Sequence, residues 1–401
     1  MMLPLEGITV LDLTRLLPGP YCSQFLGDFG AEVIKIEDTA KGDYSRWEHP
    51  LFTDSMFDDS RSAYFVALNR NKKSIKLNLK AEKGKEVFFK LAERSDVILE
   101  GFRPGVMDKL GLGYDVVKKI NKKIIFCALT GYGQTGPYKD MAGHDINYLA
   151  IAGILGMQGA KNGRPMLAGI QIADLAGGAL MALTGILMAL MARQKTGEGQ
   201  FVDISMLDGA VSLLAQHAGN YFGDGKEPRR GELNLNGGYA CYNVYKAKDG
   251  SYMALGALEE KFWAEFCRAV DREDLIAKQL ANLDEQDKLM LEVQSIFSTK
   301  DSGEWLEYLK GYDTCVTIVN ELKDTFQDRQ ILHREMYKKE RVYLDGREKL
   351  LEQVGTPIKL SATPAQYRSQ PPQYGEHTEQ ILKELGYDNS AISSMLGKGI
   401  C

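Results

Sequence analysis

The first half of the chain alternates short, β-branched apolar runs with segments of helical periodicity. The apolar runs predict strands at residues 8–14, 33–37, 74–79, 96–100 and 124–130. The segments between them predict helices at residues 24–30, 82–94 and 106–120. Strands that are buried on both faces and separated by helices are typical of βαβ units and a parallel sheet. We therefore expect a doubly wound α/β domain.

One long apolar segment follows, at residues 175–192, and it carries no charge over eighteen positions. Such a length is compatible with a membrane span. Ala and Gly supply much of the segment, however, and Asp174 and Arg193 bound it closely. We expect a helix that is buried on all sides in the protein core, followed by a strand at 200–206 and a helix at 207–222.

The texture of the chain changes at residues 223–236, which are polar and contain several glycines. This run predicts a linker between a large domain, residues 1–222, and a smaller α+β domain, residues 237–334. The smaller domain shows strand patterns at 252–258 and 316–320 and helix patterns at 261–270 and 287–297. A charged segment at 324–340 leads out of it, and residues 375–387 form an amphipathic terminal helix.

Composition removes several classes of function. The 401 residues are 44% hydrophobic with a net charge of −5, which gives no electrostatic reason to expect nucleic acid or an anionic membrane as a partner. The six cysteines are scattered, without metal-ligand spacing, so we expect neither disulfides nor a metal site. The first residues lack the basic and apolar regions of a signal peptide, and we expect a cytoplasmic protein.

A glycine motif follows the predicted strand at 124–130. Gly131, Gly133 and Gly136 match the dinucleotide fingerprint G-x-G-x-x-G letter for letter. The fingerprint works where its glycines open a helix whose N-terminus faces a pyrophosphate. Here Pro137 follows at once and no helical periodicity comes after it, so NAD binding is a minor alternative.

Two segments carry candidate chemistry. Residues 143–148, GHDINY, place His144 beside Asp145 in a loop that enters an apolar helix. Residues 172–178, IADLAGG, place Asp174 at the start of the long apolar helix. Asp174 also suits an ordinary N-cap, and His144 an ordinary loop residue, so spacing alone leaves both interpretations open.

The sequence resembles the family III CoA-transferases, and within them it is most similar to the α-methylacyl-CoA racemase branch. The resemblance runs nearly end to end. It rests on ordered motifs that include GITVLDLTRLLPGPYCSQFLGDFGAEVIKIE, LNRNKKSIKLNL, GFRPGVMDKLGLGYD, LTGYGQTGP, AGHDINYLAIAGIL, ADLAGGALMALTGILMAL, GALEEKFW and GEHTEQIL. The resemblance implies an interlocked homodimer of subunits with a Rossmann-like large domain, completed by about residues 335–401, and a small domain.

The racemase pattern implies an acid/base pair of His144 and Asp174, with Asp145 and Glu259 in support. For Glu259 a solvated charge is an equally good interpretation. Racemisation removes the α-proton of an acyl-CoA from one face and returns it to the other, so two groups must flank the carbon. We expect the N-terminus of the helix at Asp174 to stabilise the enolate oxygen. No metal or cofactor is implied, because CoA is part of the substrate.

The transferase branch uses the matching aspartate as a nucleophile instead, and forms an anhydride and then an aspartyl-CoA thioester. Asp174 suits both mechanisms. Leu17 replaces the glutamine of formyl-CoA transferases, which disfavours an oxalate-type enzyme, and Ile170 replaces an asparagine of the racemases. We therefore hold racemisation as the leading hypothesis and CoA transfer as the alternative. A non-catalytic CoA- or NAD-binding protein is a third.

The resemblance also implies contacts with CoA itself. Asn71, Lys72 and Arg103 match positions near the second and third strands, and Lys109 matches a phosphate-binding arginine of the racemases. A lysine there keeps the charge and loses the bidentate geometry of arginine. Solvated surface is an equally good interpretation of these basic residues.

Overall fold

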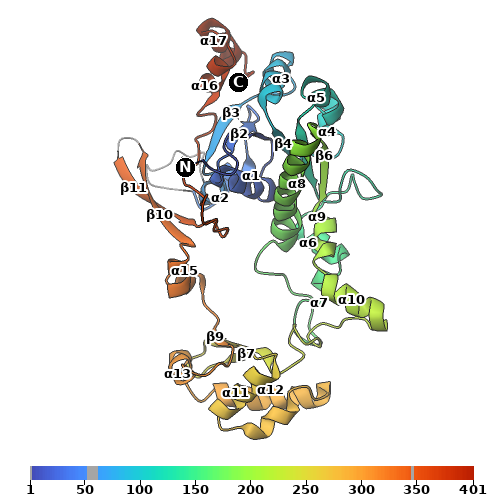
Figure 1. Ribbon diagram of the computed structural model, residues 1–401, viewed down its shortest axis with the longest axis vertical. Helices are drawn as coiled ribbons and strands as arrows, with labels where there is room; N and C mark the ends of the chain where they lie inside the picture. The colour runs from blue at the N-terminus through green and yellow to red at the C-terminus, as the bar shows by residue number, and fades with distance from the viewer. Residues whose placement is uncertain (1, 52–61, 345–346) are drawn as a thin grey trace. The chain divides into compact units, whose positions relative to one another are not determined.

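A computed structural model describes residues 2–51, 62–344 and 347–401, with the side chains of 342–349 left undescribed. The chain divides into two compact units (Figure 1). The first comprises residues 1–152, 171–213 and 329–401, and the second comprises 153–170 and 214–328. Residues 153–170 and 214–222 thus group with the second unit, whereas the sequence analysis assigned them to the large domain.

A six-stranded parallel sheet forms the centre of the first unit, as predicted. Its strands are β1 (Thr9–Asp12), β2 (Glu32–Glu37), β3 (Lys72–Lys76), β4 (Val97–Glu100), β5 (Ile125–Thr130) and β6 (Phe201–Ser205). They lie in the order β3-β2-β1-β4-β5-β6. β1 pairs with both β2 and β4, so the strand order reverses direction there. In sheets of this kind, ligands bind beyond the carboxyl ends of the strands at that reversal.

Helices cover the sheet, and three of the predicted helices have different bounds in the structure. The helix expected at 24–30 begins earlier, as α1 (Pro18–Asp28), because Pro18 opens its first turn. The helix expected at 106–120 is two helices, α4 (Val106–Leu110) and α5 (Tyr114–Ile120). Gly111 separates them with a φ of +75°, a left-handed conformation that ends α4. The helix expected at 207–222 likewise divides into α9 (Met206–Ser212) and α10 (Ala215–Asp224).

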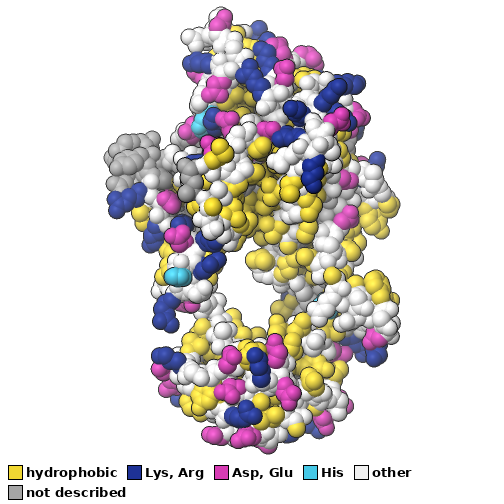
Figure 2. Space-filling model, viewed as in Figure 1, with side chains coloured by type: hydrophobic (Ala, Val, Ile, Leu, Met, Phe, Trp, Pro, Cys, Tyr) yellow, Lys and Arg dark blue, Asp and Glu magenta, His cyan; other side chains and the backbone are white. Residues whose placement is uncertain are grey.

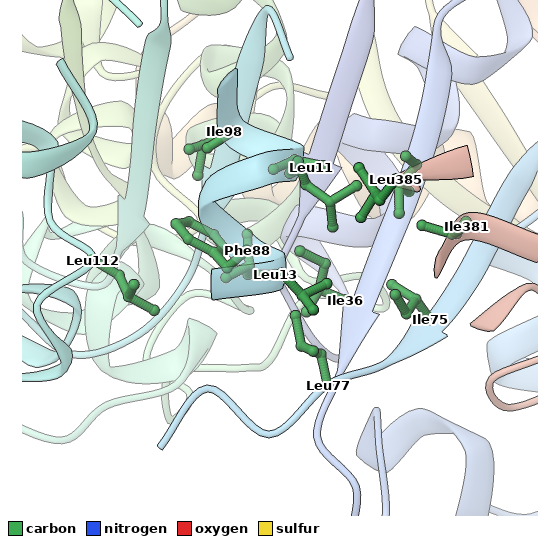
Figure 3. Close-up of a cluster of buried hydrophobic side chains, with 14 of the residues drawn as sticks. Leu11, Leu13, Ile36, Ile75, Leu77, Phe88, Ile98, Leu112, Ile381 and Leu385 are labelled. Carbon is green, nitrogen blue, oxygen red and sulfur yellow. The ribbon is translucent and has the colours of Figure 1, made fainter. Parts of the chain in front are cut away.

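The core of the first unit joins distant parts of the chain (Figure 3). Leu11 and Ile36 from the strands pack with Phe88 of α3 (Glu82–Arg94) and with Ile381 and Leu385 at the C-terminal end. Ile381 belongs to α16 (Thr378–Glu384), which is followed by α17 (Asn389–Gly397). The predicted amphipathic terminal helix is confirmed in α16. Its apolar face closes one side of this core.

The long apolar segment is one continuous helix that begins as a π-helix, η2 (Ala173–Leu180), and continues as α8 (Met181–Thr196). It is long and apolar enough to span a membrane, and 44% of its most apolar window is buried within the protein. The expectation that it is buried on all sides is wrong for the single chain. Its inner face packs on the sheet and on α1, while Met188 and Met191 are exposed.

The second unit contains a three-stranded antiparallel sheet of β7 (Tyr242–Lys246), β8 (Tyr252–Gly256) and β9 (Val316–Ile318). Its helices include α11 (Glu260–Ala269), α12 (Leu283–Phe297) and α13 (Ser302–Tyr308). Trp263, Phe266, Phe297 and Trp305 build its aromatic core. The predicted α+β character is confirmed, and β7 was missed because exposed and buried positions alternate there without an apolar run.

A β-hairpin of β10 (Tyr337–Leu344) and β11 (Arg347–Val354) belongs to the first unit and was not predicted. Lys, Arg and Glu occupy half of the positions in each strand, so no apolar periodicity indicates a strand there. The hairpin contacts the rest of the first unit through Gln353, whose side-chain amide donates a hydrogen bond to the carbonyl of Val66 at 3.0 Å.

Candidate active site

A cavity of about 1020 Å³ opens beyond the carboxyl ends of β1, β4 and β5, at the reversal in strand order. The turn after β1, the segment after β4 and the loop after β5 form its walls, and the start of η2 brings Asp174 to it. All of its lining residues lie in the first unit. The fold therefore places Asp174 and His144, which lie far apart in sequence, in the wall of one cavity.

The loop after β5 contains the glycine motif, and it does not lead into a helix. Gly133 and Gly136 adopt φ values of +84° and +87°, and the next helix is α6 (Asp145–Ile151). The expectation that no helix directly follows these glycines is confirmed. The loop instead forms part of the cavity wall, to which it contributes Gly131, Tyr132 and Gly143.

Asp174 is the second residue of the π-helical turn, and π-helical segments occur frequently at functional sites. Its carboxylate accepts no hydrogen bond from the residues that the structure describes. Burial raises the pKa of Asp174 to about 6, and the charge of Asp145 adds to this rise, whereas His144 opposes it. The mutual influence of these charges indicates that the three side chains lie close together. Asp174 is thus an ionised and unpaired carboxylate at neutral pH.

Asp145 fixes the start of the helix that carries Asp174. Its Oδ1 accepts hydrogen bonds from the N–H groups of Ala173, at 2.7 Å, and of Asp174, at 3.1 Å. The N–H of Leu175 donates to the carbonyl of Gln171 at 3.0 Å. These three donors are therefore engaged, which weighs against the expected stabilisation of an enolate by the N-terminus of this helix. Asp145 instead caps the helix and places a negative charge beside Asp174.

His144 lies at the N-terminus of α6 and is exposed at the cavity wall. Its N–H donates to Oδ1 of Asn147 at 3.0 Å, and the two residues form a capping box that fixes the start of α6. The exposed side chain of His144 can still be reached by a substrate in the cavity.

Two tyrosines near Asp174 were missed by the sequence analysis. Burial raises the pKa of Tyr148 to about 12, with a further contribution from the charge of Asp174, and its hydroxyl donates to the carbonyl of Gly143 at 2.7 Å. Burial and the charges of Asp43 and Asp174 raise the pKa of Tyr64. Both side chains line the cavity and stay neutral. Tyr148 was in a quoted motif, but only the fold shows that it lines the same cavity as Asp174.

Small residues let the elements around Asp174 approach closely. A Cβ on Gly209 of α9 would lie 2.0 Å from the carbonyl oxygen of Gly177 in η2. A Cβ on Gly177 would lie 2.8 Å from the carbonyl oxygen of Met206. Backbone therefore packs on backbone here, and this contact sets the position of the turn that carries Asp174.

A buried ionic network lies beneath the cavity. Nζ of Lys72 is 3.3 Å from Oδ2 of Asp12, and Nζ of Lys35 is 2.8 Å from Oδ2 of Asp43, with all four side chains fully buried. Burial lowers the pKa of Lys72 to about 8, although the charge of Asp12 opposes this. Unpaired charges at this depth would be costly. The network holds the carboxyl ends of the first strands in place.

The predicted CoA contacts divide into two groups. Lys72 also donates to the carbonyl of Pro20 and to Asn69, and the side chain of Asn71 bonds to Asp28, Gln366 and Arg368. Both are buried, which weighs against contact with CoA and indicates a structural role. Arg103 is exposed and lines the cavity. Lys109 is exposed on α4 outside the cavity lining.

Glu259 lies in the second unit, where it is the exposed N-cap residue of α11. Its side chain makes no capping hydrogen bond. Its predicted support of His144 and Asp174 stays a prediction.

Comparisons with known proteins show the family to which the chain belongs. Residues 5–378 match the model of CoA-transferase family III. The chain is 36% identical to a succinyl-CoA:glutarate CoA-transferase of Mus musculus, covering 100% of this chain and 90% of the relative. It is 34% identical to the α-methylacyl-CoA racemase of Homo sapiens, covering 97% and 95%. A crystal structure of a CaiB/BaiF family protein from Brucella suis superimposes with a TM-score of 0.84 at 30% identity, covering 96% and 100%. The chain belongs to CoA-transferase family III.

Proposed function

We propose that this enzyme transfers CoA from a dicarboxylic acyl-CoA to a free dicarboxylic acid, with Asp174 as the covalent nucleophile. The observation that carries the proposal is the unpaired carboxylate of Asp174 in the wall of a large cavity. Similar proteins named for succinyl-CoA and glutarate or mesaconate support this substrate class. This reverses the order of the two hypotheses drawn from sequence.

The chemistry needs a carboxylate that is ionised and lightly solvated. An oxygen of Asp174 attacks the thioester carbonyl, the C–S bond breaks, and CoA leaves as a thiolate while a mixed anhydride forms. The thiolate then attacks the carbonyl of Asp174 and releases the donor acid, which leaves an aspartyl-CoA thioester. The acceptor carboxylate reverses these two steps and departs as the new thioester. With a pKa of about 6, Asp174 is mostly ionised at pH 7.

The surrounding residues support these steps without entering them. Asp145 holds the helix turn through the N–H groups of Ala173 and Asp174 and keeps the basicity of Asp174 high. The neutral hydroxyl of Tyr64 can donate to a developing oxyanion in the cavity. Arg103 suits the phosphates of CoA at the cavity wall, and Lys109 follows it in the next helix.

Racemisation is the second candidate, and the exposed imidazole of His144, in the wall of the same cavity as Asp174, favours it. Two bases on opposite faces of an α-carbon are what that reaction requires. The engaged N–H groups of Ala173, Asp174 and Leu175 weigh against it, because these donors cannot stabilise an enolate oxygen.

A trapping experiment separates the two functions. Succinyl-CoA is incubated with the enzyme, hydroxylamine is added, and peptides are analysed by mass spectrometry. Transfer predicts a hydroxamate at Asp174, absent in Asp174→Asn. Incubation of a single enantiomer of a 2-methylacyl-CoA in deuterated water is the counter-test. Deuterium uptake at the α-carbon without any modification of Asp174 would establish racemisation and refute the proposal.

The enzyme is further proposed to act as a homodimer in the cytoplasm. Leu180, Leu187, Met188 and Met191 form an apolar stripe along η2 and α8 that is 37 to 65% exposed in the single chain. Figure 2 shows apolar side chains gathered over this part of the first unit. A second copy is the partner that would cover them. Light scattering checks this, and Met188→Glu with Met191→Glu should weaken the dimer.

A further inference from the structure

The turn between β1 and α1 fixes one arginine, Arg15, in the cavity wall. The peptide groups on both sides of it are anchored in the buried ionic network. The carbonyl of Thr14 accepts from Nζ of Lys35 at 2.8 Å, and the N–H of Leu16 donates to Oδ1 of Asp43 at 3.0 Å. Leu16 has a φ of +63°, a conformation that non-glycine residues rarely adopt and that clusters at ligand sites. The backbone of Arg15 is therefore held rigidly.

The guanidinium group is held as well. Its Nη1 donates to the hydroxyl of Tyr44 at 2.8 Å, and its Nη2 donates to Oδ2 of Asp38 at 2.7 Å. Its carbon lies 4.9 Å from the ring centre of Tyr44 and 6.0 Å from that of Phe102. The remaining N–H groups have no partner within the described ranges of the chain.

The ion pair with Asp38 leaves Arg15 able to bind a second carboxylate. Its Oδ1 accepts hydrogen bonds from the N–H groups of Ala40, at 2.9 Å, and Lys41, at 3.0 Å. Partial burial opposes ionisation of Asp38, but these backbone donors and Arg15 together lower its pKa. Because the backbone already stabilises this carboxylate, the guanidinium keeps the capacity to bind a second one.

Arg15 differs from the other cations of the cavity. Arg103 and Lys139 also line it, but both are exposed, and their side chains make no hydrogen bond or ion pair with any residue that the structure describes. Mobile cations suit the flexible phosphates of CoA. A fixed guanidinium suits a small rigid anion, because its planar donors match a carboxylate in two parallel hydrogen bonds.

We propose that Arg15 binds the distal carboxylate of the dicarboxylic substrate and thereby selects dicarboxylic over monocarboxylic acids. The inference rests on the proposed function. A dicarboxylic acid carries a second negative charge away from its reacting carboxylate, and this charge loses hydration when the substrate enters the cavity. Only a paired cation compensates that loss. A monocarboxylic acid of the same length ends in a methyl group and gains nothing from Arg15.

The test is competition between glutarate and pentanoate, which have equal chain length, as acceptors from one succinyl-CoA pool. The ratio of their kcat/KM values cancels effects on the donor. For Arg15→Met we expect the ratio of kcat/KM for glutarate over pentanoate to fall by about 100-fold, because this is the typical cost of removing one partner of a desolvated charge pair. Arg15→Lys should restore part of it. Arg103→Met is the matched control, and it should slow both acceptors alike.

Two outcomes count against the proposals. A ratio that is unchanged in Arg15→Met, whether both acids lose activity equally or neither does, overturns the inference and leaves the proposed function intact, because Arg15 then serves CoA, the fold or neither. Wild-type enzyme that transfers CoA to neither acid refutes the proposed function itself. If Arg15→Met does not fold by circular dichroism, the ratio in Arg15→Lys decides, since the lysine keeps the charge but loses the paired geometry.

Discussion

Replacing Asp145 by asparagine should make the nucleophile more acidic without displacing it. The amide oxygen of the introduced asparagine can still accept from the N–H groups of Ala173 and Asp174, so the cap at the start of η2 persists. The negative charge beside Asp174 disappears. That charge is the second cause, after burial, of the raised pKa of Asp174. Its removal therefore lowers that pKa.

The expected size of the change is bounded by the rise in the pKa of Asp174. Burial is the larger cause of the rise from 3.8 to about 6, so the contribution of Asp145 is taken as about 1 pH unit at most. At pH 5 the ionised fraction of Asp174 would then rise from roughly 9% to about 50%. Because only the carboxylate attacks the thioester, the acylation rate at pH 5 should rise by about 5-fold. Near pH 8 both forms are ionised and the rates should be similar.

The assay is the burst of free CoA after mixing with succinyl-CoA, followed with a thiol reagent from pH 4.5 to 8.5. The acid limb of the profile should move to lower pH in Asp145→Asn. Asp115→Asn, at an exposed position in the first turn of α5, is the matched control and should leave the limb in place. An acid limb that stays where it is, or moves to higher pH, would refute the assigned coupling between the two carboxylates.

Three further predictions concern the same site. Asp174→Asn should abolish transfer and stabilise the folded protein. The pKa of Asp174 is higher in the folded than in the unfolded protein, so its ionisation destabilises the fold as pH rises above the unfolded value. The increase in the free energy of unfolding, measured with urea, should therefore be near zero at pH 4 and reach up to about 3 kcal/mol at pH 8. A gain of equal size at both pH values would contradict this. His144→Ala should keep most of the transfer rate, measured by chromatography of the CoA products, and loss beyond about 100-fold would instead favour a catalytic base. Gly209→Ala should lower the free energy of unfolding by about 2 kcal/mol and slow acylation, because the added Cβ would clash with the carbonyl of Gly177. Gly219→Ala is the control, since Gly219 lies in α10 with open space around it, and this substitution should be neutral or stabilising.

The periodicity of the sequence was sufficient to predict the parallel sheet, because central strands such as β4 and β5 are buried on both faces and therefore read as continuous apolar runs. Periodicity did not predict elements that are buried on one side only or that contain many charged residues. The hairpin of β10 and β11 shows no apolar pattern, and the split of the helix at Gly111 depends on a left-handed residue that a helical pattern conceals.

The sequence also supplied His144, Asp145 and Asp174 as candidates, since their motifs resemble those of one family over nearly the whole chain. Their arrangement was decided only in three dimensions. The fold brings Arg15, in the turn after β1, and Tyr64, in α2 (Ala63–Leu68), to the wall of the cavity that contains Asp174, although sequence analysis gave neither residue a role.

What the sequence by itself determined was thus the family, the sheet and the identity of the central carboxylate, because these depend on local patterns and ordered motifs. Only the tertiary structure decided the state of that carboxylate. Burial and the neighbouring charge of Asp145 raise the pKa of Asp174. Asp145 also accepts hydrogen bonds from the N–H groups of Ala173 and Asp174, so these donors already have a partner and are less suited to stabilise an enolate. Both effects depend on distances between side chains that the sequence does not contain.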